Sequence, residues 1–152
     1  KLSCRLRWLF EYPKFTMKKD KLPFQIGKHY ENWEFDLEPS DMERILGFDS
    51  YVFIREISFL NIIPRYTELV FCWDILKVVI LTFDFETKEQ MELFRDILAL
   101  NFGSKTQFKN EDLQAEIYSV ARHIELWLVY IPDGYRIEIS YGCSKYLNII
   151  YN

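Results

Sequence analysis

The stretch ELVFCWDILKVVILTFDF, residues 68–85, decides the fold of this 152-residue chain. It contains two runs of β-branched and aromatic residues, a composition that favours strands. The runs meet near Trp73 and Asp74, which predicts two strands joined at that point. The second run, from Ile75, is apolar at nearly every position, so we expect its strand to be buried on both faces of a sheet.

Further strands are predicted on both sides of this pair. Residues 30–38 alternate, with Trp33, Phe35 and Leu37 on one side and acidic residues on the other, which predicts a strand with one buried face. Pro-Asp-Gly at 132–134 lies between two alternating runs and predicts a long hairpin. The other predicted strands cover residues 51–59, 116–131, 135–142 and 146–151, and residues 104–114 are predicted to form a polar loop.

Helices are predicted in three places. The strongest signal covers 87–103, where Thr87 and Gln90 form a capping box and Gly103 ends the helix. Ser40 with Glu43 predicts a short helix that closes at Gly47. Apolar spacing within residues 1–12 predicts an amphipathic helix. In the 87–103 helix we expect a buried stripe formed by Met91, Phe94, Ile97 and Leu98.

Hairpins dominate this order of elements, and no repeated strand–helix–strand unit occurs. The pattern indicates an α+β fold with a mainly antiparallel sheet and a few packing helices. Aromatic residues make up 18% of the chain, too many for a disordered protein. We therefore expect residues 1–152 to form a single domain.

Charge is distributed unevenly along the chain. Residues 1–28 contain eight Lys or Arg against two acidic residues, a balance of +6, whereas residues 29–152 contain eleven against twenty-one, a balance of −10. The apolar side chains Trp8, Leu9, Phe10 and Phe24 suggest that this basic N-terminal segment docks on the domain. An anionic body repels nucleic acid and attracts basic partners.

Three cysteines, Cys4, Cys72 and Cys143, are far apart in the sequence. Their number and spacing fit neither a disulfide framework nor a zinc site, and reduced thiols favour a cytoplasmic location. No apolar stretch reaches the ~18 residues of a membrane helix. No signal peptide is visible, and a lipid-anchored or secreted binding protein is the disfavoured alternative.

The stretch ENWEFDLEPSDME, residues 31–43, contains six carboxylates and no basic residue. On a straight strand Glu34, Asp36 and Glu38 would follow one another at about 6.5–7 Å, too widely spaced to converge on a metal ion. The simplest explanation is a solvated strand face. A cluster of like charges without interleaved Lys or Arg also suits a surface that attracts a basic partner.

Signals of catalysis are weak. The chain has no glycine-rich phosphate loop and no nucleophile elbow. His29 and His123 lie in separate predicted elements, with His123 placed inside a strand. Cys143 lacks a family signature, although His123 could activate it if a hairpin brought the two together. We expect no enzyme, no metal and no cofactor, and a His-dependent nuclease is the alternative.

Three segments resemble small bacterial immunity proteins of contact-dependent growth inhibition and related polymorphic toxin systems. They are FQIGKHYENWEFDLEPSDMERIL (24–46), ELVFCWDILKVVILTF (68–83) and TKEQMELF (87–94), and the resemblance extends over roughly residues 24–102. The similarity lies in overall character: each is a short, acidic, aromatic-rich α+β chain without an active site. It implies a cytoplasmic protein that binds and neutralises a cognate toxin, often a basic nuclease, without a nucleic-acid or membrane partner.

The resemblance and the charge pattern together select partner-binding residues. Carboxylates would steer the basic toxin, and exposed aromatic side chains would anchor it. Trp127 is one aromatic candidate, although it could equally belong to the core. The sequence leaves open the oligomeric state and the alternative of a general protein-interaction domain. The predicted set is Tyr30, Glu31, Glu34, Asp36, Glu38, Asp41, Glu43 and Trp127.

Overall fold

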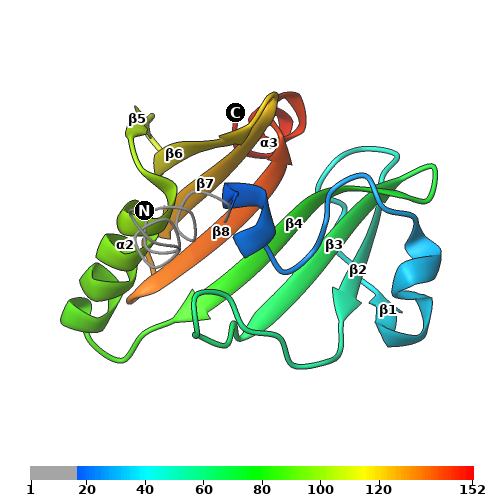
Figure 1. Cartoon of the computed structure of the whole chain (residues 1–152), viewed down its shortest axis with the longest axis horizontal. Coiled ribbons are helices and arrows are strands. Elements are labelled where there is room, and N and C mark those ends of the chain that lie inside the picture. The colour runs from blue at the N-terminus through cyan, green and yellow to red at the C-terminus, as the bar shows by residue number, and fades with distance from the viewer. Residues whose placement is uncertain (1–16) are drawn as a thin grey trace, which may run out of the picture.

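The computed structural model describes residues 17–152, which form one eight-stranded sheet (Figure 1). The strand order is β1-β2-β3-β4-β8-β7-β6-β5, and every neighbouring pair is antiparallel. The fold is therefore a sheet-dominated α+β fold, as predicted. The strands are β1 (Leu37–Pro39), β2 (Asp49–Phe53), β3 (Tyr66–Cys72), β4 (Ile75–Asp84), β5 (Lys105–Lys109), β6 (Gln114–Ala121), β7 (Ile124–Ile131) and β8 (Arg136–Cys143).

The predicted pair within residues 68–85 is confirmed as the β3–β4 hairpin. Its two-residue turn is Trp73-Asp74, and both residues have positive φ, 51° and 61°. Positive φ at both central positions is the requirement of a type I′ turn, whose twist matches that of the flanking strands. The middle of β4, residues 78–81, is completely buried, which agrees with the prediction of burial on both faces.

The sheet consists of two four-stranded meanders joined where β4 pairs with β8. Gly142 lies in that seam, opposite Val78. A Cβ atom at Gly142 would lie 2.2 Å from the carbonyl oxygen of Lys77, so only glycine permits this close approach.

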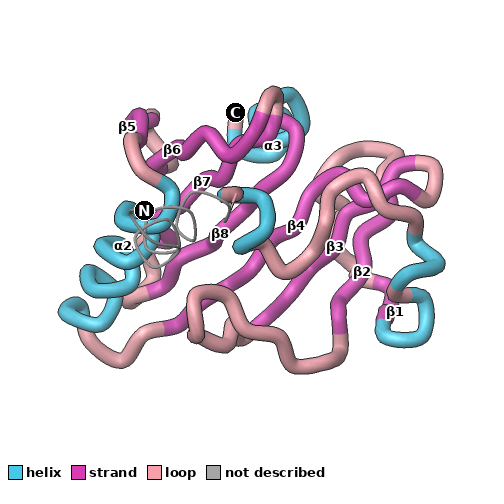
Figure 2. Tube along the Cα trace, in the orientation of Figure 1, coloured by secondary structure: helices cyan, strands magenta, loops and turns pink. Residues whose placement is uncertain are grey.

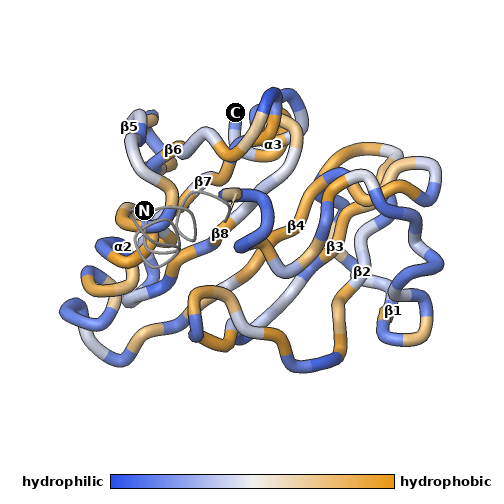
Figure 3. The backbone as a smooth tube through the Cα atoms, in the orientation of Figure 1, coloured by the Kyte–Doolittle hydropathy of each residue, from blue (hydrophilic) through white to orange (hydrophobic). Residues whose placement is uncertain are grey.

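Two hydrophobic clusters cover opposite faces of the sheet, because successive residues of β4 alternate between them. On one face α2 (Lys88–Phe102) buries Phe94, Leu98 and Phe102. On the other face α3 (Ser144–Tyr151) buries Leu147. Figure 3 shows the contrast between the hydrophobic β4 and the more hydrophilic chain that borders β1.

The 87–103 helix is confirmed, with both of its predicted ends. The Thr87 hydroxyl accepts the amide of Gln90 at 3.2 Å, and Gly103 follows the last turn with φ 80°. Of the predicted stripe, Phe94 and Leu98 are fully buried, whereas Met91 and Ile97 are half-buried.

Three predictions in the second half were wrong. Residues 116–131 form two strands rather than one, because His123 has φ 63° in a tight turn between β6 and β7. The predicted loop 104–114 contains the edge strand β5. Its contact with the core is made by Phe108, whose ring centroid lies 5.7 Å from that of Trp127. The predicted strand 146–151 is helix α3, since Leu147, Ile150 and Tyr151 also follow a helical spacing.

The predicted strand over residues 30–38 was also wrong. Two 3₁₀ turns, η2 (Tyr30–Asn32) and η3 (Glu34–Asp36), precede the short β1 (Figure 2). The amide of Trp33 bonds to the carbonyl of Tyr30, and a spacing of three places both rings on the same side, against the core. Phe35, which alternation placed in the core, is 88% exposed instead.

No helix forms at Ser40–Gly47, contrary to the capping-box prediction. The Ser40 hydroxyl accepts the amide of Met42, two residues on, and Glu43 Oε1 accepts the amide of Gly47 at 2.9 Å. These side-chain bonds stabilise bends in place of a helical turn. We call residues 40–48 the acidic loop.

The described part of the basic N-terminal segment packs on the sheet. Phe24 is buried, and the short turn η1 (Lys18–Lys21) lies against β6. Lys18 Nζ bonds to the carbonyl of Ser119 and Lys21 Nζ to that of Asn101. The predicted helix over residues 1–12 lies outside the described residues.

Candidate protein-binding surface

The acidic stretch wraps around one edge of the sheet. Tyr30 and Trp33 contact the cluster under α2, whereas Phe48 contacts the cluster under α3. The edge strand β1 lies between them and pairs only with β2. The predicted carboxylates therefore form a band around an edge, not a row on one strand face. We call the exposed residues of 31–46 the acidic band.

Five of the six predicted carboxylates are exposed, and none forms an ion pair with another residue of 17–152. They are Glu31, Glu34, Glu38, Asp41 and Glu43. The sixth, Asp36, is half-buried and pairs with Arg55 at 2.7 Å. Within residues 17–152, Asp36 is thus neutralised by Arg55, whereas the other five carboxylates have no counter-charge.

Apolar side chains are exposed within the same band. Phe35 is 88% exposed, and Met42 and Leu46 are exposed in the acidic loop. Trp73, at the tip of the β3–β4 hairpin, is 91% exposed and lies close by, because the amide of Tyr30 bonds to the carbonyl of Asp74 at 2.7 Å. Sequence patterns missed Phe35, but the Trp-Asp pair at the predicted strand junction was a signal for Trp73.

The two predicted aromatic anchors lie in different environments. Tyr30 is half-buried, with its ring 5.2 Å from that of Tyr51. Burial, with the nearby Tyr30, Asp49 and Asp74, raises the pKa of Tyr51. Trp127 is 1% exposed and stacks on Tyr151 in the core, on the face covered by α3, so it is not an exposed anchor.

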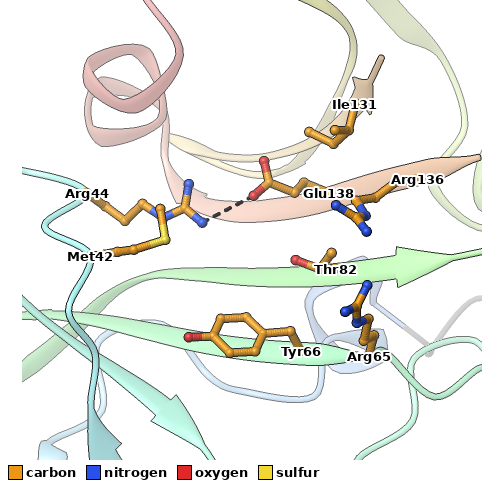
Figure 4. Close-up of a pocket in the computed structure, with 8 residues that line it drawn as sticks. All are labelled: Met42, Arg44, Arg65, Tyr66, Thr82, Ile131, Arg136 and Glu138. Atoms are coloured by element: carbon orange, nitrogen blue, oxygen red, sulfur yellow. Dashed lines mark hydrogen bonds and ion pairs between the residues drawn. The ribbon is translucent and has the colours of Figure 1, made fainter. Parts of the chain in front are cut away.

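Arg44 fastens the acidic loop to the sheet. Its Nη2 lies 3.2 Å from Glu138 on β8 (Figure 4), and its Nε donates to Glu68 on β3 at 3.1 Å. One cation therefore reaches carboxylates on two strands. Glu68 is completely buried. Burial disfavours the guanidinium charge, but the hydrogen bond and charge of Glu68 outweigh that effect and raise the pKa of Arg44.

A cavity of about 340 Å³ is lined by Arg44, Tyr66 and Thr82, among other residues (Figure 4). At its far end Arg65 and Arg136 contact Asp84 at 2.5 and 2.6 Å, and hydrogen bonds from Arg136 and then Arg65 lower the pKa of that carboxyl. Each arginine of this cavity is thus paired with a carboxylate. The arrangement neutralises positive charge that an anionic ligand would require.

The residues considered for catalysis do not form a reactive set within the described residues. His29 and His123 are both exposed, but His29 lies in an isolated β-bridge with Ile75 and His123 lies in the turn between β6 and β7. The β7–β8 pairing does place the chain at His123 beside Cys143, since Ile124 is opposite Cys143. No hydrogen bond joins those two side chains, however, and no group of three or more His, Cys, Asp or Glu in residues 17–152 could hold a metal ion.

Comparisons with known proteins add little. No family model and no curated protein matches this chain. Among solved structures, a cysteine-rich secretory protein from Staphylococcus aureus aligns with 80% of this chain and 46% of its own, at 12% identity and a TM-score of 0.43. This chain thus spans about half the length of that protein, and likeness at this level indicates no common activity. Between residues 17 and 152, no helix combines the length and apolar character needed to cross a membrane.

Proposed function

We propose that this protein is an immunity protein that binds a cognate toxin domain and neutralises it without catalysis of its own. The partner is a basic domain, such as a nuclease whose active site binds phosphates. The acidic band occupies that site in place of the nucleic-acid backbone. The compartment is the cytoplasm of the producing cell, as the resemblance to immunity proteins implies.

The observation that carries this proposal is the combination of charge and exposed apolar area in one band. Five carboxylates are exposed without a cation from the described residues, and Phe35 is exposed among them. Interfaces gain affinity from buried aromatic anchors and gain association rate from complementary charge. Phe35 and Leu46, 88% and 89% exposed, would supply apolar contact area beside the carboxylates.

Anchoring of the loop by Arg44 also favours binding. A loop that is fixed before association loses less conformational entropy when the partner arrives. The contacts from Arg44 to Glu68 and Glu138 hold the middle of the acidic loop from beneath. The carboxylates are therefore presented in a defined arrangement.

Charge reversal in the acidic band tests the steering role. Glu31→Lys, Glu34→Lys and Glu38→Lys replace exposed residues that have no ion pair in residues 17–152. At low ionic strength we expect association with the cognate toxin domain to slow about tenfold or more, with a smaller effect at high salt. Stopped-flow fluorescence measures the rate, and survival of cells that express the toxin measures protection.

A matched control carries the same charge change on another surface. Glu89→Lys, Asp96→Lys and Glu111→Lys alter exposed residues on α2 and on the segment between β5 and β6. This variant should retain nearly the wild-type association rate. Equal slowing by both variants would mean that only net charge matters, and no slowing by either would refute the steering role.

A further inference from the structure

The outer face of α2 carries a stripe of exposed apolar side chains. Leu93 and Leu100 are 61% and 86% exposed, and the half-buried Ile97 lies between them. A spacing of four and then three residues places all three on one face of the helix. Phe94 and Leu98 bury a different face against the sheet. The outer side of a surface helix is ordinarily polar, so this stripe indicates contact with a second apolar surface.

The charged residues beside the stripe are acidic. Glu89 and Asp96 lie one turn from Leu93 in the two directions along the helix, and both are exposed. Neither forms an ion pair with another residue of 17–152. Lys88 and Arg95, the two basic residues of α2, pair with other carboxylates. A segment that covers this face should therefore combine apolar with basic side chains.

The described part of the chain begins next to this helix. Lys21 Nζ bonds to the carbonyl of Asn101 in the last turn of α2. Lys18 Nζ lies 3.9 Å from the position that a Cβ atom would occupy on Gly103. The segment that precedes Met17 is thus joined to the molecule at the C-terminal end of α2.

The sequence of residues 1–12, KLSCRLRWLFEY, has the required character. It predicts an amphipathic helix in which Leu2, Leu6 and Leu9 have the same spacing of four and then three residues as the stripe on α2. Three basic residues stand against one acidic residue in this segment. Its apolar and charged residues both complement the outer face of α2.

The lengths also agree. Each stripe extends over seven positions, about 10 Å along a helix. Residues 13–16 span at most about 14 Å when extended, and Pro13 separates them from the helical pattern. That length leads from Met17, at the end of α2, to the level of Leu100, three positions before Gly103.

We propose that residues 1–12 dock as a helix on the outer face of α2, with Leu9 nearest Leu100 and Leu2 nearest Leu93. The contact buries both apolar stripes and pairs the basic residues of the segment with the carboxylates of that face. Helix α2 contacts β6, whereas the acidic band surrounds β1 at the other end of the sheet (Figure 1). Docking therefore removes a distant apolar and anionic face from competition for basic partners. It is independent of the proposed function.

Amide hydrogen exchange of the full 152-residue chain, followed by NMR, tests the docking. Leu93→Ser with Leu100→Ser removes the apolar contacts. The matched control is Ile63→Ser with Ile149→Ser, which replaces side chains 56% and 58% exposed between β2 and β3 and on α3. We expect amides of residues 2–12 to exchange at least tenfold faster in the α2 variant than in the wild-type protein, and at the wild-type rate in the control. Equal acceleration in both variants, or none, overturns the docking.

A nitroxide spin label on Cys4 then locates the segment. Cys72→Ser with Cys143→Ser leaves Cys4 as the single thiol of the chain. We expect the label to broaden amide signals of residues 92–101 most strongly, and the α2 variant to lose this broadening. Broadening of other elements, or none, overturns the placement. Broadening that appears in isotope-enriched, unlabelled protein mixed with the labelled protein means that a second copy is bound, which overturns docking within one chain. If the serine replacements impair folding, the exchange experiment decides alone.

Discussion

Arg44 is the residue on which the acidic band depends most. It is 16% exposed and connects the loop to carboxylates on two strands that are not neighbours in the sheet. Charges in such a place lose hydration on folding, and only the mutual contacts offset that loss. Removal of the cation would leave Glu68 and Glu138 buried without a counter-charge.

We expect Arg44→Met to lower the free energy of unfolding by about 3–5 kcal/mol at neutral pH, the usual effect of removing one partner of a buried ion pair. Methionine keeps much of the side-chain volume, so loss of charge pairing is the main change. Urea denaturation followed by tryptophan fluorescence measures the difference.

Arg55→Met is the matched control. Arg55 pairs with Asp36 at 2.7 Å, but its side chain is 73% exposed. Exposed pairs contribute about 0–1 kcal/mol because water screens them. Similar losses in the two variants would show that burial of Arg44 does not decide its contribution.

At the scale of elements, the tip of the β3–β4 hairpin combines a strained turn with an exposed indole. Trp73 and Asp74 occupy the left-handed region, where Asn and Gly are the favoured residues. No packing offsets this cost at Trp73, which is 91% exposed. The strain and exposure fit a residue retained for contact with a partner.

Replacement of both turn residues, Trp73→Asn with Asp74→Gly, should stabilise the protein by roughly 0.5–1 kcal/mol, because the new residues adopt positive φ at lower cost. Thermal unfolding followed by circular dichroism measures the gain. The same variant should bind the toxin domain more weakly. Unchanged stability would show that the wild-type turn is not strained. Unchanged binding would show that Trp73 does not contact the toxin domain.

Sequence patterns correctly predicted the elements that have a clear hydrophobic period or clear capping residues. The β3–β4 pair has long apolar runs, and α2 has Thr87 and Gly103 at its ends. Residues 30–38 were misassigned because two spacings coexist there. Trp33, Phe35 and Leu37 alternate as in a strand, whereas Tyr30, Trp33 and Leu37 follow a helical spacing. The edge strand β5 carried too little apolar character to predict, since one face and one edge are open to water.

The candidate site was predictable only in part, for a related reason. The carboxylates are visible in the sequence, and most of them are exposed. Their wrapping around an edge depends on the long-range pair of Arg44 with Glu138, ninety-four positions apart.

For the molecule as a whole, buried tyrosines link stability to alkaline pH. Burial and then the charge of Glu116 raise the pKa of Tyr130 to about 12. The pKa of Tyr118 is raised by the same two effects, and burial raises those of Tyr141 and Tyr151. All four hydroxyls keep their protons in the folded protein at pH values where unfolded tyrosines, with pKa near 10, lose them.

The sign of the effect follows from proton uptake. Above pH ~10 the unfolded state binds fewer protons than the native state, so the free energy of unfolding falls as pH rises from about 10 towards 12. Urea denaturation at several alkaline pH values measures the slope, and ultraviolet absorbance counts the tyrosinates. Tyr118→Phe should make the slope shallower. Ionisation of all tyrosines near pH 10 in folded protein would contradict the assignment.

The seam between the two meanders has a kinetic consequence. Within each meander, neighbouring strands follow one another along the chain, so their pairing closes short loops quickly. The β4–β8 pairing joins residues such as Val78 and Gly142, sixty-four positions apart, and must await a slow encounter of two preformed halves. Until they meet, β4 and β8 are both unprotected edges, and newly made chains are most prone to self-association during that interval.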